Sequence, residues 1–233
     1  MAEIEHQHRD LGGGGARAAV FGFSDGLVTN VSLILGVAAA HPGGTFVRLA
    51  GVAGLVAGAF SMGAGEYVSM SAQRELMQRE LDIEQVALKR TPDLERDELL
   101  ALYRHRGLDA DLARELVDAV MQDPDLALET HAREELGFTP SSLRAPLQAT
   151  VSSFMTFAAG ALLPLIPWLI GEGTAATLAS VAIGVVAALT VGMVLGIFTG
   201  RSKWRSAFRQ LAIAAVAAGV TYGIGRLVGA SGV

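Results

Sequence analysis

The sequence contains no cysteine among its 233 residues, and its aromatic content is only 6%. The absence of thiols excludes a disulfide-stabilised secreted domain and a zinc module held by cysteines. Charge is also scarce, and the net charge of −5 is atypical of nucleic-acid binders, which present a basic face, so no nucleic-acid partner is expected. Hydrophobic residues, by contrast, make up 51% of the chain, and there are 28 glycines. This composition excludes a disordered chain and is typical of helices packed in lipid.

Charged residues concentrate in one segment of the chain. Residues 72–139 hold nine Lys and Arg against seventeen Asp and Glu, whereas residues 49–65 hold none and residues 147–200 hold only Glu172. This distribution predicts a membrane protein interrupted by one acidic, water-exposed insert. Residues 1–15 are polar and rich in glycine, without the apolar core of a signal peptide, and are expected to form a disordered cytoplasmic tail.

Five apolar stretches are long enough to cross a bilayer as helices, which needs roughly 20 residues. Helix is the expected conformation, because open strands in lipid leave backbone polar groups unpaired. The predicted fold is an all-α membrane protein with two transmembrane helices in residues 16–71, a cytoplasmic helical insert in residues 72–142 and three transmembrane helices in residues 143–233. The five stretches are Ala16–Ala40, Phe46–Met70, Gln148–Ile170, Thr174–Thr199 and Ala207–Gly229.

The loop between the last two spans predicts the orientation. Residues 201–205 contain Arg201, Lys203 and Arg205, with Arg209 one turn on, and basic loops favour the cytoplasmic side. Counting spans backwards puts the N-terminus and the insert in the cytoplasm and the C-terminus outside. The compact length favours a prokaryotic inner or plasma membrane.

Proline and glycine positions divide the insert into helices. Span two is expected to continue as a helix to Lys89, followed by helices at Leu94–Arg106, Ala110–Met121 and Asp125–Leu136. Gly107 and Gly137 are expected to end the first and last of these. In the spans, five glycines are predicted to form helix-packing seams: Gly192, Gly196, Gly200, Gly219 and Gly223.

Asp25 is the one acid between residues 18 and 47. A carboxylate within a span costs about 2.5–3.5 kcal/mol on insertion scales and is a functional candidate by default. Thr29, one turn on, extends its polar face; the alternative is that Asp25 lies near the cytoplasmic end and merely caps or snorkels. In span two, Met62, Glu66 and Met70 follow one another at four-residue spacing and place a carboxylate between two thioethers. Methionine is also a common core filler.

The insert contains several carboxylates at neighbouring helical positions. Carboxylates on one helical face can bind divalent cations, although acidic helices are also commonly only solvated. Glu80 and Glu84 lie one turn apart, as do Glu95 and Glu98, and His131 lies one turn before the last pair. The candidate metal ligands are Glu80, Glu84, Glu95, Glu98, His131, Glu134 and Glu135.

Three stretches together resemble the vacuolar iron transporter family, whose members move ferrous iron or manganese out of the cytosol. They are residues 22–30 (GFSDGLVTN), 61–69 (SMGAGEYVS) and 133–137 (REELG), and the resemblance extends from about Arg17 to Gly229. It implies a homodimer with the metal path between the two copies of span one, lined by Asp25 and Met62. It also implies that the insert gathers metal through Glu84, Glu95, Glu98 and Glu135.

The chain departs from the family pattern within the insert. Eukaryotic members tend to carry a Met-Met pair where this chain has His131-Ala132, and Ala87 stands where a glutamate is expected. His131 either replaces a lost thioether or is a surface residue.

The predicted function is proton-coupled export of Fe²⁺ or Mn²⁺, because a metal ion and a proton compete for a carboxylate buried in low dielectric. No enzyme activity and no permanently bound cofactor are expected, and the expected partners are divalent metal ions, protons, the lipid bilayer and a second copy of the chain. One alternative is a membrane-anchored metal sensor or adaptor without transport. A second is an intramembrane enzyme, for which no nucleophile–base pair is evident. A third keeps transport but changes the cargo to manganese, zinc or cobalt.

Overall fold

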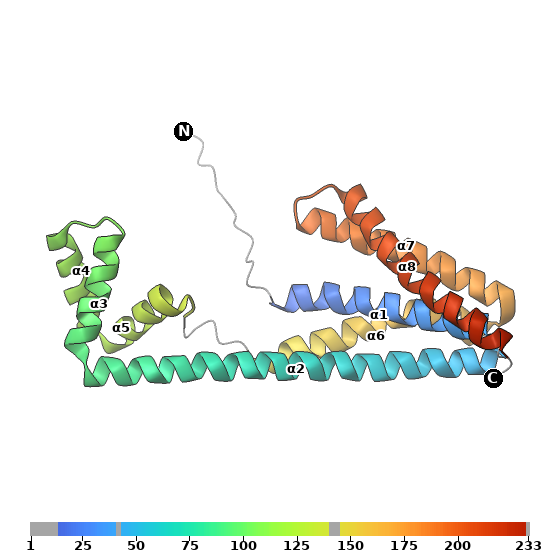
Figure 1. Ribbon diagram of the computed structural model, residues 1–233, viewed down its shortest axis with the longest axis horizontal. Coiled ribbons are helices and arrows are strands. Elements are labelled where there is room, and N and C mark those ends of the chain that lie inside the picture. Colours follow the sequence, from blue (N-terminus) through green and yellow to red (C-terminus); the bar gives the residue numbers. More distant parts are fainter. Residues whose placement is uncertain (1–13, 41–42, 140–144, 232–233) are drawn as a thin grey trace. The chain divides into compact units, whose positions relative to one another are not determined.

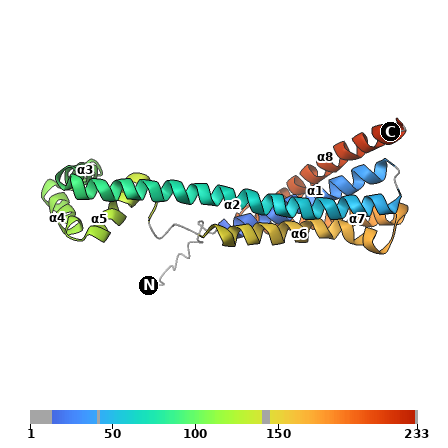
Figure 2. The same cartoon turned by 90° about the horizontal axis from the view of Figure 1, so that it is seen from below.

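The computed structural model describes residues 14–40, 43–139 and 145–231, and every regular element assigned in these ranges is a helix (Figure 1 and Figure 2). The chain forms two compact units, which we call the membrane unit (Met1–Tyr67 and Leu147–Val233) and the insert unit (Val68–Pro146). Most of the predicted tail lies outside the described residues. The elements are α1 (Gly14–Ala39), α2 (Gly44–Arg90), α3 (Pro92–His105), α4 (Ala110–Met121), α5 (Pro124–His131), η1 (Ala132–Leu136), α6 (Pro146–Ile170), α7 (Gly173–Phe198) and α8 (Lys203–Ala230).

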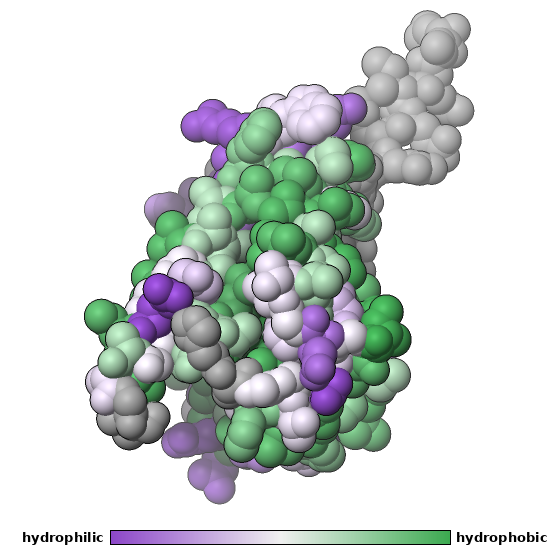
Figure 3. All heavy atoms as spheres, turned by 90° about the vertical axis from the view of Figure 1, so that its right-hand side faces the viewer, coloured by the Kyte–Doolittle hydropathy of each residue, from purple (hydrophilic) through white to green (hydrophobic). Residues whose placement is uncertain are grey.

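Five helices are long and apolar enough to cross a membrane: α1, α2, α6, α7 and α8. Large apolar side chains cover their outer faces, and Phe46 and Phe60 of α2 are each 65% exposed. Seen from the end of the membrane unit where α2 begins, hydrophobic residues dominate the surface and hydrophilic ones form small patches (Figure 3). Such a surface is unfavourable in water and favourable in lipid. The predicted all-α fold with five spans is confirmed.

Small residues allow the spans to touch backbone to backbone. A Cβ atom on Gly26 of α1 would collide with the carbonyl oxygen of Phe157, and one on Gly160 of α6 would collide with that of Phe23. The α7–α8 contact uses Gly192 and Gly196, as predicted. In lipid this close approach replaces the hydrophobic effect as the source of helix association.

The predicted seam in span five is placed incorrectly. Cβ atoms on Gly219 and Gly223 would meet nothing within 4 Å of this chain, whereas those on Gly225 and Gly229 would collide with the backbone of Gly36 in α1 and of Ala40 just after it. Gly200 is not a packing residue either, because it follows the end of α7 with a φ of +65°. All of these glycines lie within or just after apolar stretches, so composition alone does not indicate which helix face meets a neighbour.

Polar side chains of α1 and α7 bind the backbone of α6 near its two internal prolines. Nδ2 of Asn30 donates to the carbonyl oxygen of Ala161 at 2.6 Å, and Oγ of Ser180 donates to that of Pro164 at 2.7 Å. A proline removes one backbone donor from its helix, and neighbouring side chains commonly satisfy carbonyls around such a break. These bonds tie α6 to the two helices that flank it.

The insert unit has a small apolar core of its own. Leu99 of α3, Val117 and Val120 of α4 and Ala127 of α5 are buried together. The carboxylates of Asp109 and Asp123 accept backbone hydrogen bonds at the first turns of α4 and α5, which fixes where both helices begin. The predicted bounds of α4 are confirmed.

The last predicted helix of the insert, Asp125–Leu136, is divided in the structure. α5 ends at His131, and the next five residues form the π-helix η1, which ends at Gly137 with a φ of +73°. A π-helical turn is wider than an α-helical one and occurs frequently at functional sites.

We expect Gly26→Ala to destabilise the membrane unit, because overpacking of a tight contact costs about 1–3 kcal/mol. The matched control is Gly219→Ala in α8, where a Cβ meets open space. Thermal unfolding of both variants in the same detergent tests this. A Gly26→Ala protein as stable as the Gly219→Ala protein would show that α1 and α6 do not pack as described.

Candidate functional site

Three buried side chains converge in the insert unit: Glu84 from α2, Glu95 from α3 and His131 from α5. One ligand atom from each lies within 4.8 Å of the other two. Nδ1 of His131 is 3.2 Å from Oε1 of Glu84 and 3.9 Å from Oε2 of Glu95. Glu135 of η1 places its Oε1 3.2 Å from the same nitrogen. We call these four residues the insert cluster.

The local fold explains why residues so far apart in sequence meet. Thr91 alone separates α2 from α3, and Pro92 starts α3 at a position where its missing N–H costs no hydrogen bond. The chain reverses there, so Glu84 before the turn and Glu95 after it face each other. On the other side, Glu135 of η1 lies four residues after His131, the residue that ends α5, and its carboxylate lies against that ring.

Three of the four residues of the insert cluster are buried, and the hydrogen bonding of the cluster is incomplete. His131 is 0% exposed, Glu84 8% and Glu95 6%. Nδ1 of His131 forms a hydrogen bond with Glu135, but among the described residues Oε1 of Glu84 has no hydrogen-bond partner. Buried carboxylates are normally paired or bound to a cation. Three carboxylates around one imidazole exceed what that ring can neutralise, so the cluster has the chemistry to accept a divalent cation.

Burial raises the pKa of Glu84 and of Glu95, and it is the largest cause for both groups. For Glu84, the nearby His131 opposes this shift, while the charges of Glu135, Glu95 and Glu98 add to it. A cation bound between these carboxylates would offset the cost of burying their charge, because it favours their charged form and lowers their pKa.

The remaining predicted ligands of the insert lie outside the insert cluster. Glu98 is exposed, yet its charge acts on both Glu84 and Glu95. Glu134 forms an ion pair with Arg106 instead of joining the insert cluster. Glu80 is half-buried and is not among the residues brought together there. Of the two alternatives for His131, the surface residue is wrong, because the ring is completely buried.

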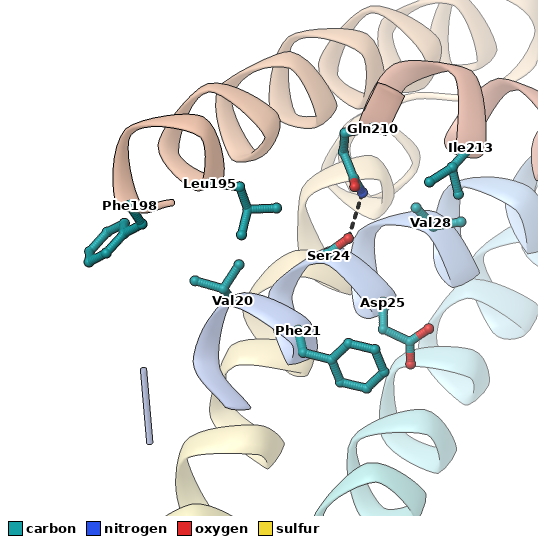
Figure 4. Close-up of a pocket in the computed structure, with 9 residues that line it drawn as sticks. All are labelled: Val20, Phe21, Ser24, Asp25, Val28, Leu195, Phe198, Gln210 and Ile213. Atoms are coloured by element: carbon teal, nitrogen blue, oxygen red, sulfur yellow. Dashed lines mark hydrogen bonds between the residues drawn. The ribbon is translucent and has the colours of Figure 1, made fainter. Parts of the chain in front are cut away.

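Asp25 lines a cavity of about 580 Å³ in the membrane unit, between α1, α7 and α8. Its carboxylate accepts a hydrogen bond from the exposed Thr29 one turn on. Ser24 and Gln210 line the same cavity, and Nε2 of Gln210 donates to Oγ of Ser24 at 2.5 Å (Figure 4). The Asp25 carboxylate points away from this pair in the close-up. Sequence reasoning missed Gln210, although an amide in an otherwise apolar stretch was a usable signal.

The predicted path residues of α2 lie in different settings. Met62 packs against a buried cluster of Ala59, Phe157 and Ala161, as a core-filling side chain does. Glu66 is half-buried in the membrane unit. Met70 is also half-buried and belongs to the insert unit. Their order along α2 is as predicted, and their role in transport stays a prediction.

Comparison with known proteins identifies the family. The family model described as "VIT family" matches residues 16–226, which is nearly the whole chain. The chain belongs to the VIT family. Among its relatives, a vacuolar iron transporter 1 of Oryza sativa subsp. japonica is 32% identical over 213 residues, covering 91% of this chain and 84% of that protein. A vacuolar iron transporter of Acanthamoeba castellanii is 35% identical over 222 residues, covering 92% of this chain and 78% of that protein.

The match to the VIT family includes both the membrane unit and the insert unit. Vacuolar iron transporter 1 of Arabidopsis thaliana, at 30% identity, also aligns over 91% of this chain. The resemblance inferred from residues 22–30, 61–69 and 133–137 is therefore confirmed at the level of the family. The insert cluster and Asp25 both lie inside the matched range.

We expect Glu84→Gln to raise the thermal stability of the protein at pH 7 in the presence of a chelator. The folded state raises the pKa of Glu84 above its ordinary value of 4.5, so the charged form opposes folding at pH 7. For a chain of this size, a change of about 1 kcal/mol in the free energy of unfolding corresponds to a change of ~2–4 °C in Tm. The advantage of the variant must shrink as the pH is lowered toward 4.5, because wild-type Glu84 then becomes protonated.

Thermal unfolding between pH 7 and pH 5 measures this difference. The matched control is Glu115→Gln, which changes an exposed glutamate of α4. A Glu84→Gln protein that is less stable than wild type in chelator would contradict the described burial of that carboxylate.

Proposed function

We propose that this chain is a proton-coupled transporter that exports Fe²⁺, with Mn²⁺ as a second cargo, from the cytosol. The observation that carries the proposal is the insert cluster, in which the buried Glu84 and Glu95 and the more exposed Glu135 surround one buried imidazole. Membership of a family whose relatives are named vacuolar iron transporters supports the cargo class.

The insert unit collects the cation. Its acidic surface raises the local concentration of divalent cations. The insert cluster then binds one of them, and the exposed Glu98 adds negative charge nearby. Carboxylates with a softer donor suit Fe²⁺ better than the all-oxygen shells preferred by Mg²⁺ and Ca²⁺.

The membrane unit carries the cation across the bilayer. Met70 and Glu66 receive it along α2, and Met62 and Asp25 hold it within the span, with Thr29 beside the carboxylate. Metal and proton compete for the oxygens of Asp25, so release of the metal is accompanied by uptake of a proton. This exchange couples transport to a pH gradient without a nucleotide.

Two copies of the chain form the path between their α1 helices. Phe21 and Thr29 are exposed on α1, and in a dimer of this kind they face the second copy. The basic loop between α7 and α8 lies in the cytoplasm, together with the insert unit and the N-terminal end of α1. The C-terminal end of α8 lies outside.

The proposal predicts that Asp25→Asn abolishes metal flux and that Met62→Ala reduces it. The assay is uptake of Fe²⁺ or Mn²⁺ into proteoliposomes whose interior is acidic, compared with vesicles without a pH gradient. Glu172→Gln and Met155→Ala are the matched controls, because both side chains are well exposed and lie away from the proposed path. Wild-type flux from Asp25→Asn protein would remove this residue from the path. No flux from wild-type protein under a gradient would favour the sensor or adaptor alternative.

The proposal also predicts that Thr29→Cys cross-links two copies of the chain. The protein has no other cysteine, so a disulfide dimer formed in membranes reports on position 29 alone. Val216→Cys on α8 is the control, because this residue is exposed on a helix that the proposed dimer leaves in lipid. Equal cross-linking at both positions, or cross-linking only at position 216, would contradict a dimer built on α1.

A further inference from the structure

We infer that His131 is a specificity-determining ligand of the insert cluster, whose Nδ1 biases metal loading toward Zn²⁺, Ni²⁺ and Fe²⁺ over Mn²⁺ and Mg²⁺. The inference rests on the proposed function, since it assigns selectivity to the same cluster. It goes beyond that proposal because it names the cations that the collection site favours and the atom responsible.

The spacing of the donor atoms fits a first-row divalent cation. A cation bound tetrahedrally at about 2.0–2.2 Å from its ligands has donor atoms about 3.4 Å apart. Nδ1 of His131 lies 3.2 Å from Glu84, 3.2 Å from Glu135 and 3.9 Å from Glu95. These distances lie on both sides of the tetrahedral value. The ligand atoms of Glu84, Glu95 and His131 all lie within 4.8 Å of one another, so one cation can contact these three groups after side-chain shifts.

The orientation of the imidazole ring points Nδ1, and not Nε2, at the cation position. A neutral imidazole carries one N–H and one lone pair. If the N–H is on Nε2, Nδ1 presents its lone pair to carboxylate oxygens, an arrangement that a cation between them stabilises. The ring is completely buried, and among the described residues Nε2 has no hydrogen-bond partner. Packing and the hydrogen bond between Nδ1 and Glu135 therefore hold the ring with Nδ1 facing the carboxylates.

A second buried atom points to the same cation position. Oε1 of Glu84 is buried without a hydrogen bond, although it lies 3.2 Å from Nδ1 of His131. The hydrogen bond of that nitrogen goes to Glu135. A metal ion coordinated by Nδ1, Glu84 and Glu95, whose ligand atoms all lie within 4.8 Å of one another, would satisfy this oxygen of Glu84.

The nitrogen donor changes which cations the site prefers. Carboxylates alone suit Mg²⁺ and Mn²⁺, whereas imidazole suits Zn²⁺, Ni²⁺ and Fe²⁺. A site with one nitrogen among oxygens therefore binds the second group more tightly, and removal of the nitrogen reduces the difference. Mn²⁺, which gains least from the imidazole, should be least affected by its loss.

The test is competitive binding of Zn²⁺ and Mn²⁺ to the full-length protein in detergent, with His6 and His8 replaced by Gln in every sample. His131→Gln should weaken Zn²⁺ binding by at least about tenfold, the lower end of what changes around metal ligands cost. Mn²⁺ binding should change much less. The matched control is His105→Gln, which removes an exposed imidazole of α3 and should leave both affinities unchanged.

X-ray absorption at the zinc edge gives a readout that a merely structural role would not move. At one equivalent of Zn²⁺, imidazole scattering should be present in the parent protein and in His105→Gln, and absent in His131→Gln. If His131→Gln fails to fold, His131→Met fills the buried space with a flexible apolar side chain and must also lose the imidazole signal.

Two outcomes separate this inference from the proposed function. If His131→Gln keeps the imidazole signal and the Zn²⁺ to Mn²⁺ preference while Glu84→Gln loses metal binding, the inference is overturned and the collection site stands. If Glu84→Gln also binds both metals as the parent protein does, the cluster is not the collection site and both ideas fail.

Discussion

The imbalance of charge in the insert cluster is the constraint on which the insert unit depends. The unit does not lack arginines, but they pair with acids away from the cluster: Arg96 with Asp118, Arg106 with Glu134 and Arg133 with Glu129. Two of the three acids that are left with one imidazole, Glu84 and Glu95, are buried, and an unpaired charge is most costly there. The imbalance is therefore local and specific, and it differs from the general acidity of residues 72–139. A site arranged in this way gains most from a cation that comes and goes.

The membrane unit contains fewer charges, and its buried polar contacts include hydrogen bonds between helices. Two of its buried polar side chains donate to backbone oxygens of a neighbouring helix, Asn30 to Ala161 and Ser180 to Pro164. Glycines such as Gly26 and Gly160 bring the helices close enough for these bonds to form. Asp25 is different, because the hydrogen bond to its carboxylate comes from the neighbouring turn of its own helix, from Thr29. A carboxylate bound in this way stays available to an incoming ion.

Features that depend on length and composition, such as the membrane spans, could be predicted from the sequence. Contacts that depend on which of two adjacent residues faces a given neighbour could not. Apolar runs of span length and the glycine after the last insert helix were sufficient to place the spans and Gly137 correctly. Glu134 and Glu135, by contrast, are adjacent and chemically identical. Glu135 lies four residues after His131 and meets its ring, as helical spacing allows, whereas the pairing of Glu134 with Arg106 depends on how the helices of the insert unit pack. The burial of His131 was equally hidden, because it arises from the contact of three helices rather than from a local pattern.

Burial is graded across the insert cluster, and this grading bears on how a cation can leave it. The side chain of His131 is 0% exposed and that of Glu84 is 11% exposed, whereas that of Glu135 is 30% exposed. Glu98, whose charge acts on the cluster, is exposed as well. The cluster therefore has a closed side that binds and an open side in contact with solvent. Under the proposed function the cluster must release its cargo as readily as it binds it, and water that reaches Glu135 would replace this ligand first. In that scheme the buried groups would provide selectivity, and the partly exposed one would provide exchange.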